Sequence, residues 1–143
     1  MPESYEDILK KQGTLIFTPH GNSMQPLLQN GKNPVVLLPI TKPLQKGDVP
    51  FYKRPNGQYV LHRIVRVRKH SYDLCGDNQS ALEKGVTDDM MIAVMAGFYQ
   101  GDTYIAADDP KIRRYAKRRM ASRPLRRAAA LFGYAVKKLF SKP

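Results

Sequence analysis

The chain has 143 residues and a formal net charge of +12, with 24 Lys and Arg residues against 12 Asp and Glu. This length suffices for one domain with a hydrophobic core and is too short for two. The single cysteine, Cys75, excludes an intrachain disulfide, and a lone thiol is more often a small buried residue than a nucleophile. No apolar run approaches the ~20 residues of a membrane span, and the N-terminus lacks a signal-peptide pattern. We therefore expect a cytoplasmic protein without a membrane anchor.

The first half of the chain predicts a short helix followed by strands. Ser4 followed by Asp7 is typical of a helix start, and Gly13 can end that helix, so we expect a helix over residues 4–12. Apolar, β-branched runs predict strands at 14–18, 35–38 and 49–53. Because proline cannot donate to a ladder, Pro50 should lie on an edge strand or at a bulge.

Turn residues and alternating hydrophobicity predict further strands. Pro55-Asn56-Gly57 indicates a hairpin turn into an alternating arm over 58–68. Further strands are expected at 72–75, 92–99 and 103–106. Many short strands separated by turn residues indicate a mainly β fold, a small coiled sheet or partial β-barrel, with the short N-terminal helix and a helical C-terminal tail.

The positive charge is concentrated in that tail. Residues 111–143 hold twelve bases and no acid follows Asp109, so the rest of the chain is neutral overall. The composition changes after residue 109 and divides the chain into a β domain, 1–109, and a basic tail, 110–143. The tail predicts one helical segment that Pro124 interrupts, and from Leu125 onward a basic amphipathic helix.

Ser23 and His62 are the candidate catalytic residues. A serine hydroxyl needs a base to remove its proton during attack, and a neutral imidazole can do so. Asp77, in a Gly-Asp-Asn turn, is the acid expected to hold the other imidazole nitrogen. Gly21 allows a tight turn before Ser23, and the backbone N–H groups of Ser23 and Gly21 are candidate oxyanion donors.

Other interpretations of these residues stay open from spacing alone. Serine and aspartate in glycine turns are commonly just turn formers, and a strand histidine is commonly a packed residue. His20 and His70 compete with His62 as the base; His20 lies in a Pro-Gly turn and His70 in a polar turn.

Four short segments occur in an informative order: 21–26 (Gly-Asn-Ser-Met-Gln-Pro), 44–49 (Leu-Gln-Lys-Gly-Asp-Val), 59–65 (Tyr-Val-Leu-His-Arg-Ile-Val) and 76–78 (Gly-Asp-Asn). Together they resemble the boxes of the signal peptidase I and LexA-like serine peptidase superfamily over residues 14–105. The resemblance implies Ser23 as nucleophile and His62 as base, as in the endoplasmic-reticulum and archaeal branch. It aligns Asp77 with the family's Gly-Asp-Asn aspartate. Glu83 stands where that branch often has a second aspartate, as a possible supporting acid.

The sequence thus predicts a serine endopeptidase that cleaves a precursor peptide or protein without metal or cofactor. The alternative is a non-catalytic or self-cleaving LexA-like module that docks to anionic partners. The tail has three candidate partners: its own domain or a second protomer, an anionic membrane surface at the inner side of the membrane, and, less favoured, nucleic acid. Substrate, cleavage motif and oligomeric state stay open.

Overall fold

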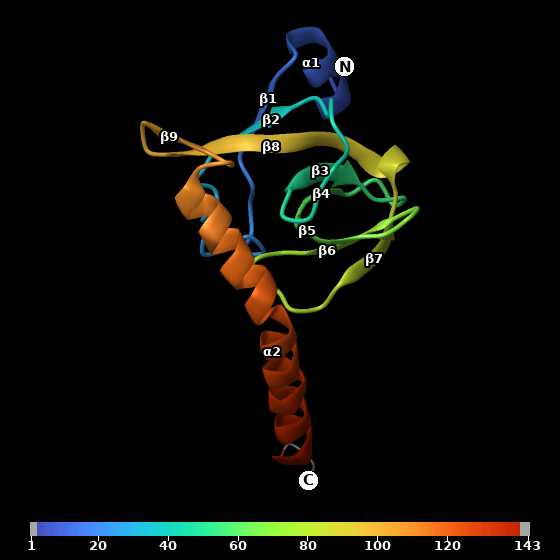
Figure 1. The fold of residues 1–143 in the computed structure, drawn as a ribbon, viewed down its shortest axis with the longest axis vertical. Coiled ribbons are helices and arrows are strands. Elements are labelled where there is room, and N and C mark those ends of the chain that lie inside the picture. Colours follow the sequence, from blue (N-terminus) through green and yellow to red (C-terminus); the bar gives the residue numbers. More distant parts are fainter. Residues whose placement is uncertain (1–2, 141–143) are drawn as a thin grey trace.

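The computed structural model describes residues 3–140, which form two α-helices, nine strands and one 3-10 turn (Figure 1). The helices are α1 (Tyr5–Gln12) and α2 (Pro110–Phe140), and the 3-10 turn is η1 (Asp88–Met90). The strands are β1 (Leu15–Phe17), β2 (Val35–Leu38), β3 (Pro50–Lys53), β4 (Tyr59–Leu61), β5 (Arg63–Val67), β6 (Tyr72–Cys75), β7 (Glu83–Val86), β8 (Met91–Gln100) and β9 (Thr103–Ala106).

The strands form two antiparallel sheets that together curl into a half-barrel. In the larger sheet the order is β1-β2-β8-β3-β4, and β9 also pairs with β8. The smaller sheet has the order β5-β6-β7. Strand β8 is the longest strand described and joins β2, β3 and β9, and register shifts opposite β2 and β3 bend the sheet around it. Figure 1 shows the smaller sheet facing the larger one across the body.

Local sequence signals account for several of these elements. The Ser4 hydroxyl accepts from the Asp7 amide at 3.1 Å, and Gly13, at φ 71°, ends α1, which confirms the predicted helix. The strands predicted at 35–38 and 72–75 occur with those bounds. Pro50 lies neither on an edge strand nor in a bulge: it is the first residue of the interior strand β3, where pairing with β4 has not yet begun. The adjacent bulge lies between Phe51 and Tyr52.

The predicted arm over 58–68 is divided between the two sheets. Strand β4 belongs to the larger sheet and β5 to the smaller one, and His62 is the residue between them. Leu61 packs in a core cluster with Phe51 and Phe98, whereas Val60 and Ile64 pack in a second cluster with Tyr52 and Leu74. Residues 60–64 are therefore all buried, and the simple alternation expected from the sequence ends where the chain passes from one sheet to the other.

The long C-terminal helix makes the fold mixed rather than mainly β. Helix and strand each account for about 30% of the chain, because α2 alone has 31 residues. Pro124 does not interrupt it, contrary to the prediction: the helix is continuous from Pro110 to Phe140. Beside the proline, the Arg119 carbonyl accepts from the Ser122 hydroxyl and from the Arg126 guanidinium, which adds polar contacts to the turn that proline weakens.

The two halves of α2 have different surroundings. In the first half, Ile112 and Tyr115 pack against the core of the larger sheet and Ala116 is buried. The second half extends away from the body (Figure 1). The division after residue 109 stays a prediction, but the first half of the tail is packed onto the β structure.

Candidate active site

Ser23 lies in the tight segment that follows β1. Gly21 adopts φ +98°, a conformation that side chains rarely reach, and its amide donates to the Asn30 side chain at 2.8 Å. That amide is therefore not free to serve as an oxyanion donor, which corrects the expectation for Gly21. The Ser23 backbone N–H is left as the candidate donor. Ser23 is half-buried, and its carbonyl accepts from the Asn78 amide at 2.8 Å.

Ser23 and His62 line the same cavity, which has a volume of about 250 Å³. The cavity lies where the turn after β1 meets the end of β4, and Tyr59 and Gln79 also line it. The fold thus brings together two residues that the sequence separates widely. His20 lines the cavity too, but it is exposed, whereas His70 lies in the turn between β5 and β6 and is not among the lining residues.

The environment of His62 favours the neutral imidazole. Burial lowers the pKa of His62 from 6.5 to about 4; the Glu83 charge opposes this shift and Arg54 adds to it. His62 is 7% exposed, and its Nδ1 is buried without a hydrogen-bond partner. The closest acid to that nitrogen is Glu83, whose Oε1 lies 4.0 Å away. At neutral pH the imidazole can accept a proton.

Glu83, at the start of β7, is the acid that faces His62. Its carboxylate accepts from Tyr52 Oη at 2.7 Å and from two Arg54 nitrogens at 2.9 and 2.6 Å. Burial opposes ionisation of Glu83, but the hydrogen bonds from Arg54 and Tyr52 outweigh it and lower the pKa of the carboxyl. The site therefore holds a fixed negative charge beside His62 Nδ1.

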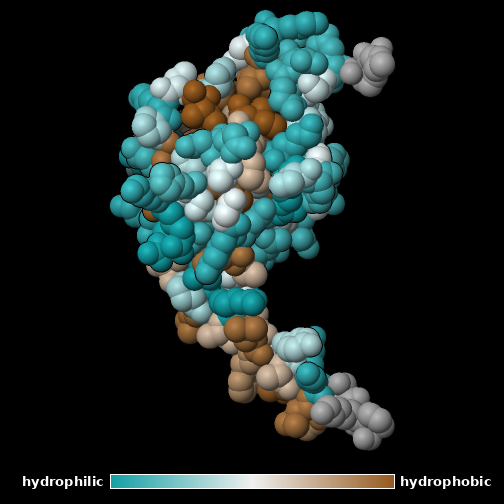
Figure 2. Space-filling model, turned by 90° about the vertical axis from the view of Figure 1, so that its right-hand side faces the viewer, coloured by the Kyte–Doolittle hydropathy of each residue, from teal (hydrophilic) through white to brown (hydrophobic). Residues whose placement is uncertain are grey.

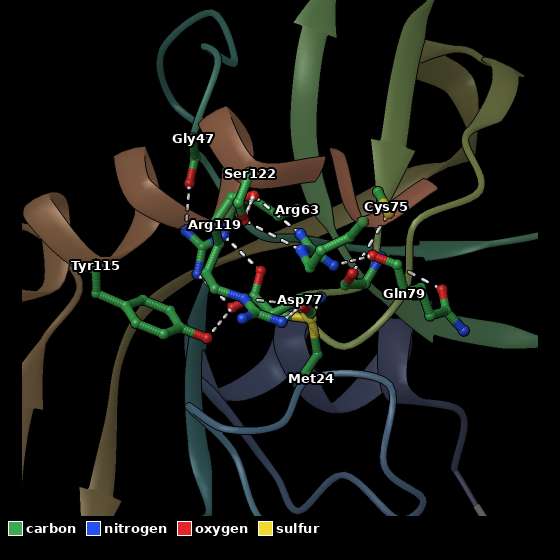
Figure 3. A network of polar contacts seen from close by, with 11 residues as sticks. Met24, Gly47, Arg63, Cys75, Asp77, Gln79, Tyr115, Arg119 and Ser122 are labelled. Atoms are coloured by element: carbon green, nitrogen blue, oxygen red, sulfur yellow. Dashed lines mark hydrogen bonds and ion pairs between the residues drawn. The ribbon is translucent and has the colours of Figure 1, made fainter. Parts of the chain in front are cut away.

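Asp77 occupies a different place from the one expected. Its Oδ1 accepts from Arg63 Nε at 2.8 Å, and its Oδ2 accepts from Arg63 Nη2 at 2.9 Å and from Tyr115 Oη at 2.8 Å (Figure 3). Because Nδ1 of His62 has no hydrogen-bond partner, Asp77 does not orient the imidazole through that nitrogen. Arg63 also donates to the Gly47 carbonyl at 2.8 Å, so Asp77 joins β5, the turn before β3 and α2.

Helix α2 holds the loop that contacts the nucleophile. Arg119 donates to the Asp77 carbonyl, Arg126 to the Gln79 carbonyl and Arg123 to the Ser80 carbonyl. Within this loop the Asn78 amide bonds the Ser23 carbonyl. Docking of the tail on its own domain was one of three alternatives open from the sequence, but no individual arginine was predicted to make these contacts. Only the spacing of three and four residues between the arginines on a helix indicates a shared face.

Gly76 has a steric role next to Ser23. A Cβ at this position would lie 2.5 Å from the Ser23 carbonyl oxygen, well inside van der Waals contact. The glycine of the Gly-Asp-Asn segment thus permits the close approach of the two loops. This contact couples the position of Ser23 to loop 76–80.

Other candidate groups do not add chemistry to the cavity. Cys75 is buried, and burial raises the pKa of its thiol, which disfavours the nucleophilic thiolate. Within residues 3–140, no group of three or more His, Cys, Asp or Glu side chains is arranged to hold a metal ion. A larger groove of about 830 Å³ runs past α1 and the start of β8. Among the described residues, Arg54 is the one that lines both this groove and the cavity of Ser23.

Comparison of the chain with protein-family models and with curated proteins gave no match. The resemblance of the four segments to signal peptidases therefore remains a prediction from the sequence.

Proposed function

We propose that this protein is a serine endopeptidase of the signal-peptidase-like type, with Ser23 as nucleophile and His62 as general base. The observation that carries the proposal is that a half-buried serine and a buried histidine, neutral at physiological pH, line one cavity. Serine acyl-transfer chemistry needs a serine and an activating base in one site, and a neutral imidazole can be that base.

In this mechanism Ser23 Oγ attacks the carbonyl carbon of the scissile peptide bond while His62 removes its proton. Because Nδ1 of His62 lies on the Glu83 side, Nε2 is the nitrogen assigned to the serine proton. The Ser23 backbone N–H stabilises the oxyanion. His62 then protonates the leaving amine, and a water molecule, deprotonated by His62, releases the acyl group.

Glu83 is assigned the supporting role that was expected for Asp77 from the sequence. A negative charge near Nδ1 stabilises the imidazolium that forms during proton transfer. The 4.0 Å separation is longer than a hydrogen bond, and such contacts commonly shorten when substrate is bound. Shortening would also raise the basicity of His62, which burial holds low.

The test is covalent labelling by a fluorophosphonate probe, read by intact mass. The purified wild type should gain one probe mass, and Ser23→Ala and His62→Ala should not. Ser80→Ala is a matched control, because Ser80 is also a half-buried loop serine but does not line the cavity. Circular dichroism of each variant establishes that it is folded.

Two results would contradict the proposal: absence of labelling in folded wild type, or labelling that persists in Ser23→Ala. Absence of labelling would favour a binding module that keeps the fold without the chemistry, and persistent labelling would assign the reactive nucleophile to another residue.

A further inference from the structure

Helix α2 presents one face to the body and the opposite face to solvent. The inward face of its first half carries Ile112, Tyr115, Arg119, Arg123 and Arg126, all of which contact the body. At ~100° per residue these side chains lie on one side of the helix. The outward face of the same helix is therefore free of the body.

The outward face changes character along the helix. In the first half it carries exposed bases: Lys111, Arg114, Lys117 and Arg118. In the second half, the same face carries an apolar stripe, which spans an arc of roughly 140°. The stripe consists of Leu125, Ala128, Ala129, Phe132, Ala135, Val136, Leu139 and Phe140.

The large side chains of the stripe are unusually exposed for their type. Leu125, Phe132, Leu139 and Phe140 are 76%, 71%, 72% and 82% exposed. Figure 2 shows brown, hydrophobic side chains along the projecting half of the helix, below a body whose visible face is mostly hydrophilic. Contiguous apolar surface of this kind marks a contact site.

The exposed bases of the first half of α2 and the apolar stripe of its second half together distinguish between possible partners. A nucleic-acid backbone would match the bases but leave the phenylalanines and leucines in water. A second copy would match the apolar stripe, but its helix has no acidic residue between Pro110 and Phe140. The bases of the two helices would therefore repel each other. An anionic bilayer matches both, because its headgroups attract the bases and its acyl boundary accepts the apolar side chains. No helix within residues 3–140 is long and apolar enough to span a membrane.

We propose that the outward face of α2 is a docking surface for an anionic lipid bilayer, with the apolar stripe inserted in the interface and the bases of the first half against the headgroups. The inward arginines of the same helix hold loop 77–80 beside Ser23. Docking therefore places the cavity of Ser23 near the membrane surface. The surface itself does not depend on the proposed catalysis.

The experiment is co-sedimentation of the full chain with vesicles of phosphatidylcholine alone or mixed with phosphatidylglycerol. The wild type should sediment with the anionic vesicles and not with the neutral ones. The double variant Phe132→Gln/Leu139→Gln should lower the partition coefficient at least about tenfold. Arg114→Gln/Arg118→Gln should lower it about fivefold for each charge removed, and added salt should weaken wild-type binding.

The matched control is Leu131→Gln/Tyr134→Gln, which removes exposed apolar side chains from the same half of the helix but off the stripe. It should leave binding unchanged, and Ser23→Ala should bind as the wild type does, so a failed peptidase assay leaves this result intact. Circular dichroism reports whether each variant keeps its helix.

Three results would overturn the proposal: no preference for anionic vesicles, equal losses in the stripe variant and its control, or a wild-type oligomer that the stripe variant dissociates in sedimentation velocity. The last result would assign the stripe to a second copy of the chain.

Discussion

Replacing Asp77 by asparagine should destabilise the protein strongly, because Asp77 neutralises a buried arginine. The side chains of Arg63 and Asp77 are 3% and 2% exposed, and two hydrogen bonds of 2.8 and 2.9 Å join them. Asp77→Asn keeps the size of the side chain but leaves the guanidinium charge buried without its counter-ion. Breaking such a pair costs about 3–5 kcal/mol of the free energy of unfolding.

Urea unfolding followed by circular dichroism measures this cost. The matched control is Lys11→Ala, which breaks an ion pair with Glu3 whose side chains are 67% and 46% exposed; its loss should stay below about 1 kcal/mol. Adding Arg63→Met to Asp77→Asn should recover part of the stability, since the uncompensated charge is then removed. A loss below about 1 kcal/mol for Asp77→Asn would refute the reasoning and reopen a role for Asp77 beside His62.

Three further predictions concern the cavity. As pH falls, His62 becomes protonated near pH 6.5 in the unfolded chain and only near pH 4 in the folded chain. The contribution of the neutral imidazole to the free energy of unfolding is therefore complete above about pH 6.5, and at most about 3 kcal/mol of stability is lost as pH falls towards 4. Urea unfolding of His62→Gln should show a smaller pH slope than wild type over this window, and equal slopes would contradict the buried neutral imidazole. Glu83→Gln should slow probe labelling of Ser23 at neutral pH at least about tenfold in a protein that is still folded, because the charge beside Nδ1 is lost; an unchanged rate would remove Glu83 from the mechanism. Gly76→Ala should also reduce labelling, because its Cβ displaces the Ser23 carbonyl, and wild-type labelling would show that the loop can yield without moving the serine.

Elements with local signals were predicted well. A cap and a terminating glycine define α1, and short apolar runs between turn residues define β2 and β6. Strand β7 was missed because its sequence, Glu-Lys-Gly-Val, has no apolar alternation; it is a strand because it pairs with β6. The continuity of α2 through Pro124 was missed for a similar reason, since the helix is supported there by contacts with loop 77–80.

The sequence by itself determined the candidate nucleophile, the candidate base and the uneven distribution of charge, because residue type and order carry those properties. Tertiary structure decided which acid faces which partner. Asp77 and Glu83 both follow His62 in the chain, yet Asp77 pairs with Arg63 while Glu83, held by Tyr52 and Arg54, lies beside the imidazole. That choice depends on the crossing of the chain between two sheets at His62 and on the docking of α2. Both result from packing between distant segments, which local residue preferences do not encode.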